Sequence, residues 1–91
     1  MSEDSPKRGT FAYTKHAETV MAERRIDPIW VERIIRSPER SGSDPMSPER
    51  TRVFGRVAEF GGRWLRVVYE VETEAILIVT AFFDRNAGRE S

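Results

Sequence analysis

The chain has 91 residues, which is enough for one domain and too few for a two-domain enzyme. Its 15 basic and 15 acidic residues cancel to a formal net charge of zero, so total charge gives it no long-range attraction to a polyanion. The absence of cysteine excludes thiol catalysis and thiolate zinc sites, and with one histidine we expect no metal site and no cofactor. No apolar run approaches the roughly 20 residues that span a bilayer, and residues 1–8 do not resemble a secretory signal. We therefore expect a cytoplasmic protein with no membrane contact.

The first half of the chain has the pattern of a short strand followed by two helices. Residues 1–8 are polar and are predicted to be a disordered tail, and residues 9–13 are predicted to form a short edge strand. Apolar residues then recur at helical spacing in two segments that begin with residues suited to capping a helix. The predicted helices run from Thr14 to about Arg25 and from Asp27-Pro28 to Ser37-Pro38.

The second half changes to the alternating pattern of strands. Residues 37–50 are rich in proline and serine and are predicted to be a long loop. Strands are predicted over residues 51–60, 63–72 and 75–83, followed by a disordered tail over 86–91. The sequence therefore predicts a single α+β domain over residues 9–85. In it, two N-terminal helices pack on one face of a three- to four-stranded antiparallel sheet.

Gly61-Gly62 predicts a two-residue hairpin turn and with it a register for the first two long strands. This register places Phe60 opposite Arg63, Ala58 opposite Leu65, Arg56 opposite Val67 and Phe54 opposite Tyr69. Those residues would share the more apolar face, under the helices. Trp64 and Arg66 would lie on the other face, beside Val57, as an aromatic and basic surface.

His16 is the candidate for proton transfer, because it is the only side chain whose ordinary pKa lies near neutrality. It would lie in the first helical turn, where the free amide groups disfavour a positive charge and can bind an anion. Arg24 follows eight residues later on nearly the same helix face, where it could clamp a phosphate, and Glu23 is adjacent. Surface or packing roles for His16, Glu23 and Arg24 remain the alternative.

The arginines are concentrated on the first predicted hairpin. Residues 50–69 contain five arginines and one acid, Glu59, and the arginines alternate with aromatic residues. Such surfaces bind single-stranded RNA, because bases stack on the rings and arginine contacts phosphates. The candidate nucleic-acid-binding residues are Arg52, Arg56, Trp64, Arg66 and Tyr69, and Arg85 at the end of the third strand could add a cation. An amphipathic hairpin whose arginine stems cover apolar surface is the alternative interpretation.

Several short motifs of the chain resemble the family known as domain of unknown function 4258, over residues 14–85. The motifs are Thr14-Lys15-His16-Ala17, Glu23-Arg24 followed by Ile26, Pro38, Arg52, Phe54-Gly55-Arg56, Gly62 to Val68 and Val79 to Arg85. The chain departs from the family at Val20, where relatives often have arginine, and at Arg25, where they often have glycine.

The resemblance implies a place in the barnase and RelE-like group of small nucleases, many of which are bacterial toxins. It implies helices on one face of an antiparallel sheet and nucleic acid on the other. Three hypotheses follow. The first is a metal-independent endoribonuclease of toxin type, in which His16 and Glu23 carry protons and Arg24, Arg66 and Arg85 stabilise charge. The others are a non-catalytic RNA-binding module, and a protein-interaction module whose partner is a cognate antitoxin or a second copy of the chain.

Overall fold

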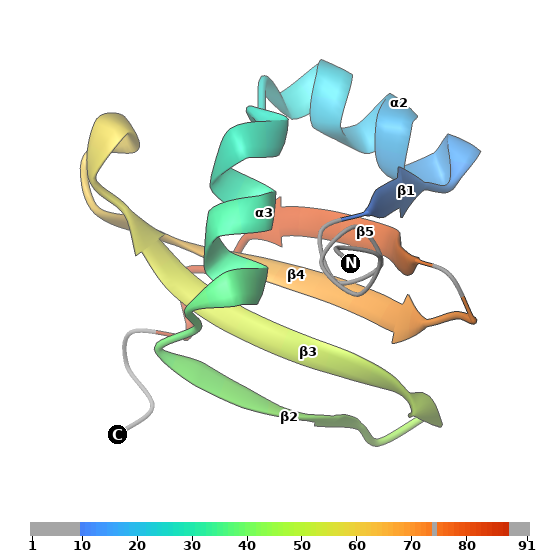
Figure 1. Ribbon diagram of the computed structural model, residues 1–91. Coiled ribbons are helices and arrows are strands. Elements are labelled where there is room, and N and C mark those ends of the chain that lie inside the picture. Colours follow the sequence, from blue (N-terminus) through green and yellow to red (C-terminus); the bar gives the residue numbers. More distant parts are fainter. Residues whose placement is uncertain (1–9, 74, 88–91) are drawn as a thin grey trace, which may run out of the picture.

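The computed structural model describes residues 10–73 and 75–87, in which two helices cover one face of a five-stranded sheet (Figure 1). In chain order the elements are β1 (Phe11–Tyr13), α2 (Lys15–Arg24), α3 (Pro28–Arg36), β2 (Arg40–Asp44), β3 (Ser47–Val57), the 3-10 turn η1 (Ala58–Phe60), β4 (Arg63–Val71) and β5 (Ile76–Phe83). Helix α2 packs mainly on β5, and α3 packs on β3 and β4.

The chain is α+β as expected, but the predicted antiparallel sheet of three to four strands is wrong. The sheet is mixed, with strand order β1-β5-β4-β3-β2, because β1 runs parallel to β5 while the other neighbours are antiparallel. The short edge strand predicted over residues 9–13 is present as β1, before the two helices, but the sequence did not predict its parallel pairing. A tight turn between two antiparallel strands can be recognised in the sequence. No such turn joins β1 to β5, because they are parallel and far apart in the chain, so the sequence gives no local signal for their pairing.

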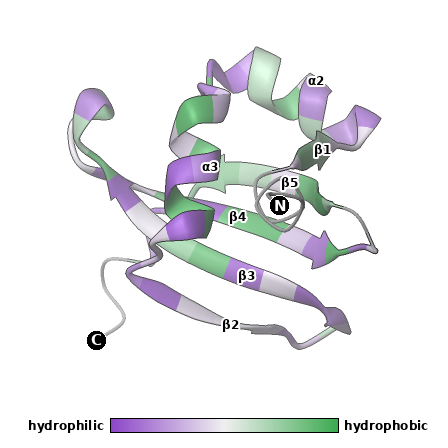
Figure 2. Ribbon diagram, in the orientation of Figure 1, coloured by the Kyte–Doolittle hydropathy of each residue, from purple (hydrophilic) through white to green (hydrophobic). Residues whose placement is uncertain are grey.

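The segment 37–50, predicted as a long loop, is mostly part of a β-hairpin. Strand β2 pairs with β3, with Arg40 opposite Phe54 and Gly42 opposite Arg52. Its sequence, Arg-Ser-Gly-Ser-Asp, has no apolar alternation, and Figure 2 shows β2 hydrophilic to neutral in contrast to the largely hydrophobic β5. A polar edge strand such as β2 is stabilised by its backbone pairing with the neighbouring strand. It has no alternation of apolar residues, so hydrophobic periodicity does not reveal it.

The hairpin between β3 and β4 has a different register from the predicted one. Arg63 pairs with Val57 and not with Phe60, because residues 58–60 leave the strand and form η1. The amide of Gly62 closes the connection on the carbonyl of Val57 at 2.8 Å, and both Gly61 and Gly62 have positive φ. The register thus differs by three residues. Because an odd shift turns a strand over, Phe54 and Arg56 move to the same face as Trp64 and Arg66.

The two predicted helices are confirmed, together with their caps. Thr14 accepts a hydrogen bond from the amide of Ala17, and Asp27 accepts one from the amide of Ile29. Helix α2 ends at Arg25, whose φ of 58° and ψ of 42° are left-handed. Glycine is the residue that adopts this conformation without steric cost, so an arginine here is under backbone strain.

The core lies between the helices and one face of the sheet. Its largest fully buried side chains are Leu65, Ile78, Val31, Val53, Val57 and Val67. Strand β3 places Gly55 directly under α3, where an added Cβ would lie 2.8 Å from Cγ1 of Ile34. Glycine at this position therefore allows α3 to approach the sheet closely.

The two predicted tails lie largely outside the described residues, and only the start of the second can be compared with the structure. The predicted tail 1–8 and residues 88–91 of the predicted tail 86–91 lie outside the described residues. Asn86 and Ala87 are described and form a turn in which Ala87 is buried. Within the described residues, neither helix combines the length and the apolar character needed to cross a membrane.

We expect Gly55→Ala to lower the free energy of unfolding by about 1–3 kcal/mol, because the new methyl group overpacks the contact with Ile34. Urea denaturation monitored by circular dichroism measures the change. Gly42→Ala is the matched control, since a Cβ at Gly42 meets no atom within 4 Å and should change stability little. Equal stability of the two variants would show that α3 does not need glycine beneath it.

Candidate nucleic-acid cleft

Thr14 fixes the position of α2 against β5. Its amide donates to the carbonyl of Ile78 at 3.0 Å, and its hydroxyl donates to the carbonyl of Val79 at 3.1 Å. The same hydroxyl oxygen accepts the amide of Ala17 at 3.0 Å and so caps the helix. One residue therefore both begins α2 and attaches its first turn to β5, at the last residue that pairs with β1 and at the residue after it.

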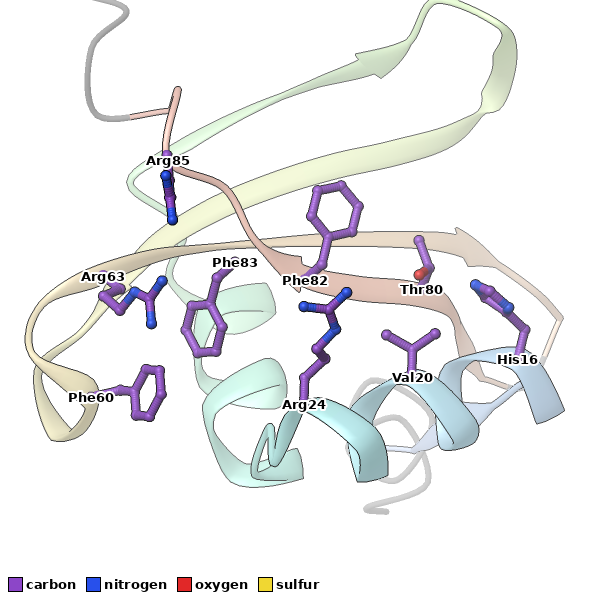
Figure 3. A pocket seen from close by; sticks show the side chains of 9 residues that line it. All are labelled: His16, Val20, Arg24, Phe60, Arg63, Thr80, Phe82, Phe83 and Arg85. Atoms are coloured by element: carbon purple, nitrogen blue, oxygen red, sulfur yellow. The ribbon is translucent and has the colours of Figure 1, made fainter.

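A cleft of about 760 Å³ opens between α2 and β5 (Figure 3), and we call it the α2 cleft. His16, Val20 and Arg24 lie in a row on α2, because residues four apart share one face of a helix. Figure 3 shows that this face points toward β5. Figure 3 shows Arg63 and Arg85 toward the end of the cleft opposite to His16. The lining residues are His16, Val20, Arg24, Phe60, Arg63, Thr80, Phe82, Phe83 and Arg85.

The lining of the α2 cleft contains three arginines and a histidine but no acid. Three of the predicted catalytic residues, His16, Arg24 and Arg85, thus line the same cleft, with His16 and Arg85 toward its opposite ends. Glu23 is not among them, because it is exposed and does not line the cleft. Arg63, which the sequence did not single out, stacks over the rings of Phe60 and Phe83 with 5.3 Å from its guanidinium carbon to each ring centroid.

The face of the sheet opposite the helices, here called the open face, alternates arginine with aromatic residues. The register places Phe54 beside Arg66 and Arg56 beside Trp64, and Arg66 beside Phe82. The guanidinium carbons lie over the rings: Arg40 and Arg56 over Trp64, each at 5.4 Å, and Arg66 over Phe54 at 5.4 Å and over Phe82 at 4.9 Å. Cations within about 6 Å of a ring centroid are attracted by it.

Four of the five predicted nucleic-acid-binding residues lie on the open face, namely Arg52, Arg56, Trp64 and Arg66. Tyr69 does not, because it packs against the core opposite Ile78 and so cannot stack a base beside Trp64. Sequence reasoning missed Arg40, Phe54 and Phe82. The corrected hairpin register accounts for Phe54, and the unforeseen strand β2 accounts for Arg40.

Three of the arginines on the open face are bound to acids. Arg50 donates to Glu70 at 2.8 Å. Arg56 donates to Glu39 at 2.9 Å, and these hydrogen bonds hold the pKa of Glu39 below its ordinary value. Arg66 donates to Asp84 at 2.6 Å. Burial of Asp84 opposes its ionisation, but the bonds from Arg66 and from the amides of Asn86 and Ala87 lower the pKa of this carboxyl overall.

The described residues contain no group of three or more histidines, aspartates and glutamates that could hold a metal ion. The side chains that line the α2 cleft can supply proton transfer at His16 and charge stabilisation by arginine.

We expect Asp84→Asn to lower the free energy of unfolding at pH 7 by about 1.5–3 kcal/mol, since Arg66 loses a charged hydrogen-bond partner. The folded-state pKa of Asp84 lies below its ordinary value of 3.8, so this stabilisation is present above that pH. It is lost as the pH falls through the lower folded value. Urea denaturation at pH 7 and pH 2–3 should therefore show a smaller difference between wild type and variant in acid. Glu72→Gln, an exposed acid on a turn, is the control and should behave as wild type at both pH values.

One family model matches the chain over residues 13–83. This range includes both helices, with His16, Val20 and Arg24 on α2, and nearly all of the sheet. Comparison with curated proteins and with solved structures finds no significant match. The chain belongs to the family described as Domain of unknown function (DUF4258).

Proposed function

We propose that the chain binds single-stranded RNA and cleaves it in the α2 cleft. The observation that carries the proposal is that the one histidine and three arginines line a single cleft without an acid. A phosphodiester is attracted to such a lining, and a histidine is the side chain best suited to move a proton at neutral pH. The α2 cleft also shares Phe82 with the open face, whose arginines and rings match the chemistry of a single strand.

The proposed reaction is attack by the 2′-hydroxyl of the RNA on its own phosphate. His16 removes the hydroxyl proton, the 2′-oxygen forms a bond to phosphorus, and the bond from phosphorus to the 5′-oxygen breaks. Arg24 stabilises the charge of the phosphorane, and Arg63 and Arg85, toward the opposite end of the cleft from His16, hold the adjoining part of the RNA strand. The departing 5′-oxygen takes its proton from water, because Glu23 does not line the cleft. The products are a 2′,3′-cyclic phosphate and a 5′-hydroxyl end.

A small ribonuclease of the barnase and RelE-like group, acting as a bacterial toxin, is the cellular role that this activity would fit. A cognate antitoxin, or a second copy of the chain, is the partner proposed with it. The second candidate function is RNA binding without catalysis. The position of Glu23 favours this candidate. The reaction moves two protons, but because Glu23 does not line the cleft, His16 is the one lining residue proposed to transfer a proton.

We expect His16→Ala to reduce cleavage of a single-stranded RNA in EDTA by about 10²–10⁴-fold, because the proton acceptor is lost. Binding of RNA with its 2′-hydroxyls methylated should change little. Thr19→Ala is the control, since Thr19 is exposed on the same helix and does not line the cleft. Product ends identified by mass spectrometry report the cyclic phosphate. If the wild type leaves RNA intact, or if His16→Ala cleaves equally well, the ribonuclease proposal is wrong and binding without catalysis remains.

We expect Arg24→Gln to weaken binding of the methylated RNA and to reduce the slope of log affinity against log salt by about one, as for the loss of one phosphate contact. Lys15→Gln removes the same charge from the same helix but outside the cleft lining, so its slope should stay close to that of wild type. Fluorescence anisotropy over a salt series measures both. Equal losses in the two variants would mean that the helix attracts RNA only through its total charge.

A further inference from the structure

Two further hollows adjoin the α2 cleft at the C-terminal end of β5 and on the open face. A second hollow of about 270 Å³, here called the Trp64 hollow, shares Arg63, Phe83 and Arg85 with the α2 cleft. It also contains Asp84, which lines a third hollow of about 290 Å³ on the open face, here called the Arg52 hollow. Each hollow therefore shares lining residues with the next, and together they extend from His16 on α2 to Arg52 on β3.

The Arg52 hollow has the composition of an anion site. Its lining includes three arginines and a single acid, Asp84, whose carboxylate is already bound by Arg66. The remaining residues are Ser41, Gly42, Phe54, Asn86 and Ala87. Gly42 lies opposite Arg52 in the sheet and has no side chain, so the hollow stays open on that side.

Arg52 is distinguished from its neighbours by a missing partner. Arg50, Arg56 and Arg66 each donate to an acid. The Nε atom of Arg52 is buried and, within the described part of the chain, has no hydrogen-bond partner. A buried donor on a charged group without a partner is costly. An anion in the hollow reduces this cost, because it compensates the charge of the guanidinium that lines the wall.

We propose that the Arg52 hollow is a second phosphate site, and that one RNA strand runs through the three adjoining hollows from the α2 cleft to β3. This inference rests on the proposed function and adds to it the class of substrate, a single strand several nucleotides long. Trp64 lies between the two phosphate sites, flanked by Arg40 and Arg56, at the position where a base of the strand passes. An RNA strand that occupies both sites crosses the end of β5. We expect a dinucleotide to occupy the α2 cleft alone, without contact to Arg52, because Arg52 does not line that cleft.

The test compares a short and a long ligand with two variants of equal charge. Arg52→Gln removes the proposed phosphate contact, and Arg36→Gln removes a charge from the C-terminal end of α3, on the helical side of the sheet. The ligands are a methylated RNA of about ten nucleotides, a length typical of single-strand sites, and a methylated dinucleotide. Cleavage of an unmodified dinucleotide is recorded for each protein, and circular dichroism checks that each variant is folded.

Arg52→Gln should weaken binding of the ten-nucleotide RNA about tenfold and lower its salt slope by about one. Binding and cleavage of the dinucleotide should not change, and Arg36→Gln should match wild type in every measurement. The inference is overturned if Arg52→Gln binds the long RNA as wild type does, or if it loses both ligands in the same proportion.

The outcome also separates this inference from the proposed function. If RNA is cleaved at His16 but Arg52→Gln has no effect on the long strand, cleavage stands and the second phosphate site falls. If long RNA binds in an Arg52-dependent way but is never cleaved, the second site stands and the catalytic proposal falls. If neither RNA binds to the wild type, both are wrong.

Discussion

The α2 cleft depends on the hydrogen bonds of Thr14. A helix could lie along the edge of β5 at many heights and rotations, and the cleft residues would then point elsewhere. Thr14 removes this freedom, because its hydroxyl is shared between the first turn of α2 and the backbone of β5. With the first turn fixed, the helical repeat alone directs His16, Val20 and Arg24 toward the strand. The geometry of the candidate site is thus set by backbone contacts outside its lining.

The neutral total charge conceals an uneven distribution of paired and unpaired cations. Among the described residues, acids bind Arg33, Arg50, Arg56 and Arg66. The lining of the α2 cleft receives no such acid. Ion pairing thus neutralises much of the sheet surface, whereas the positive charge of the three arginines that line the α2 cleft is not balanced by an acid in that lining. Any attraction of a phosphodiester would act at short range, within the cleft itself.

The helices could be predicted from the sequence because their ends are encoded locally, by Thr14 and by Asp27-Pro28. The row of His16 and Arg24 followed from helical spacing for the same reason. The sheet was harder to predict. Its first strand pairs with its last, and β2 is a polar segment whose partner lies across a turn. Gly61-Gly62 marked the hairpin correctly, but nothing in the sequence indicated that residues 58–60 would leave the strand. This one local detail decided whether Phe54 and Arg56 faced the helices or the open face.

The position of α2 against β5 has a consequence for synthesis of the protein. Both walls of the α2 cleft must be present before the cleft exists, and they come from opposite ends of the sequence, α2 from residues 15–24 and the strand wall from residues 80–85. While β5 is still inside the ribosome, α2 lacks the strand that forms the other wall of the cleft. The cleft appears only after the last strand has emerged and replaced solvent along α2. A protein built in this way has no functional cleft at any intermediate length, so an activity located there is withheld until translation of the domain is complete.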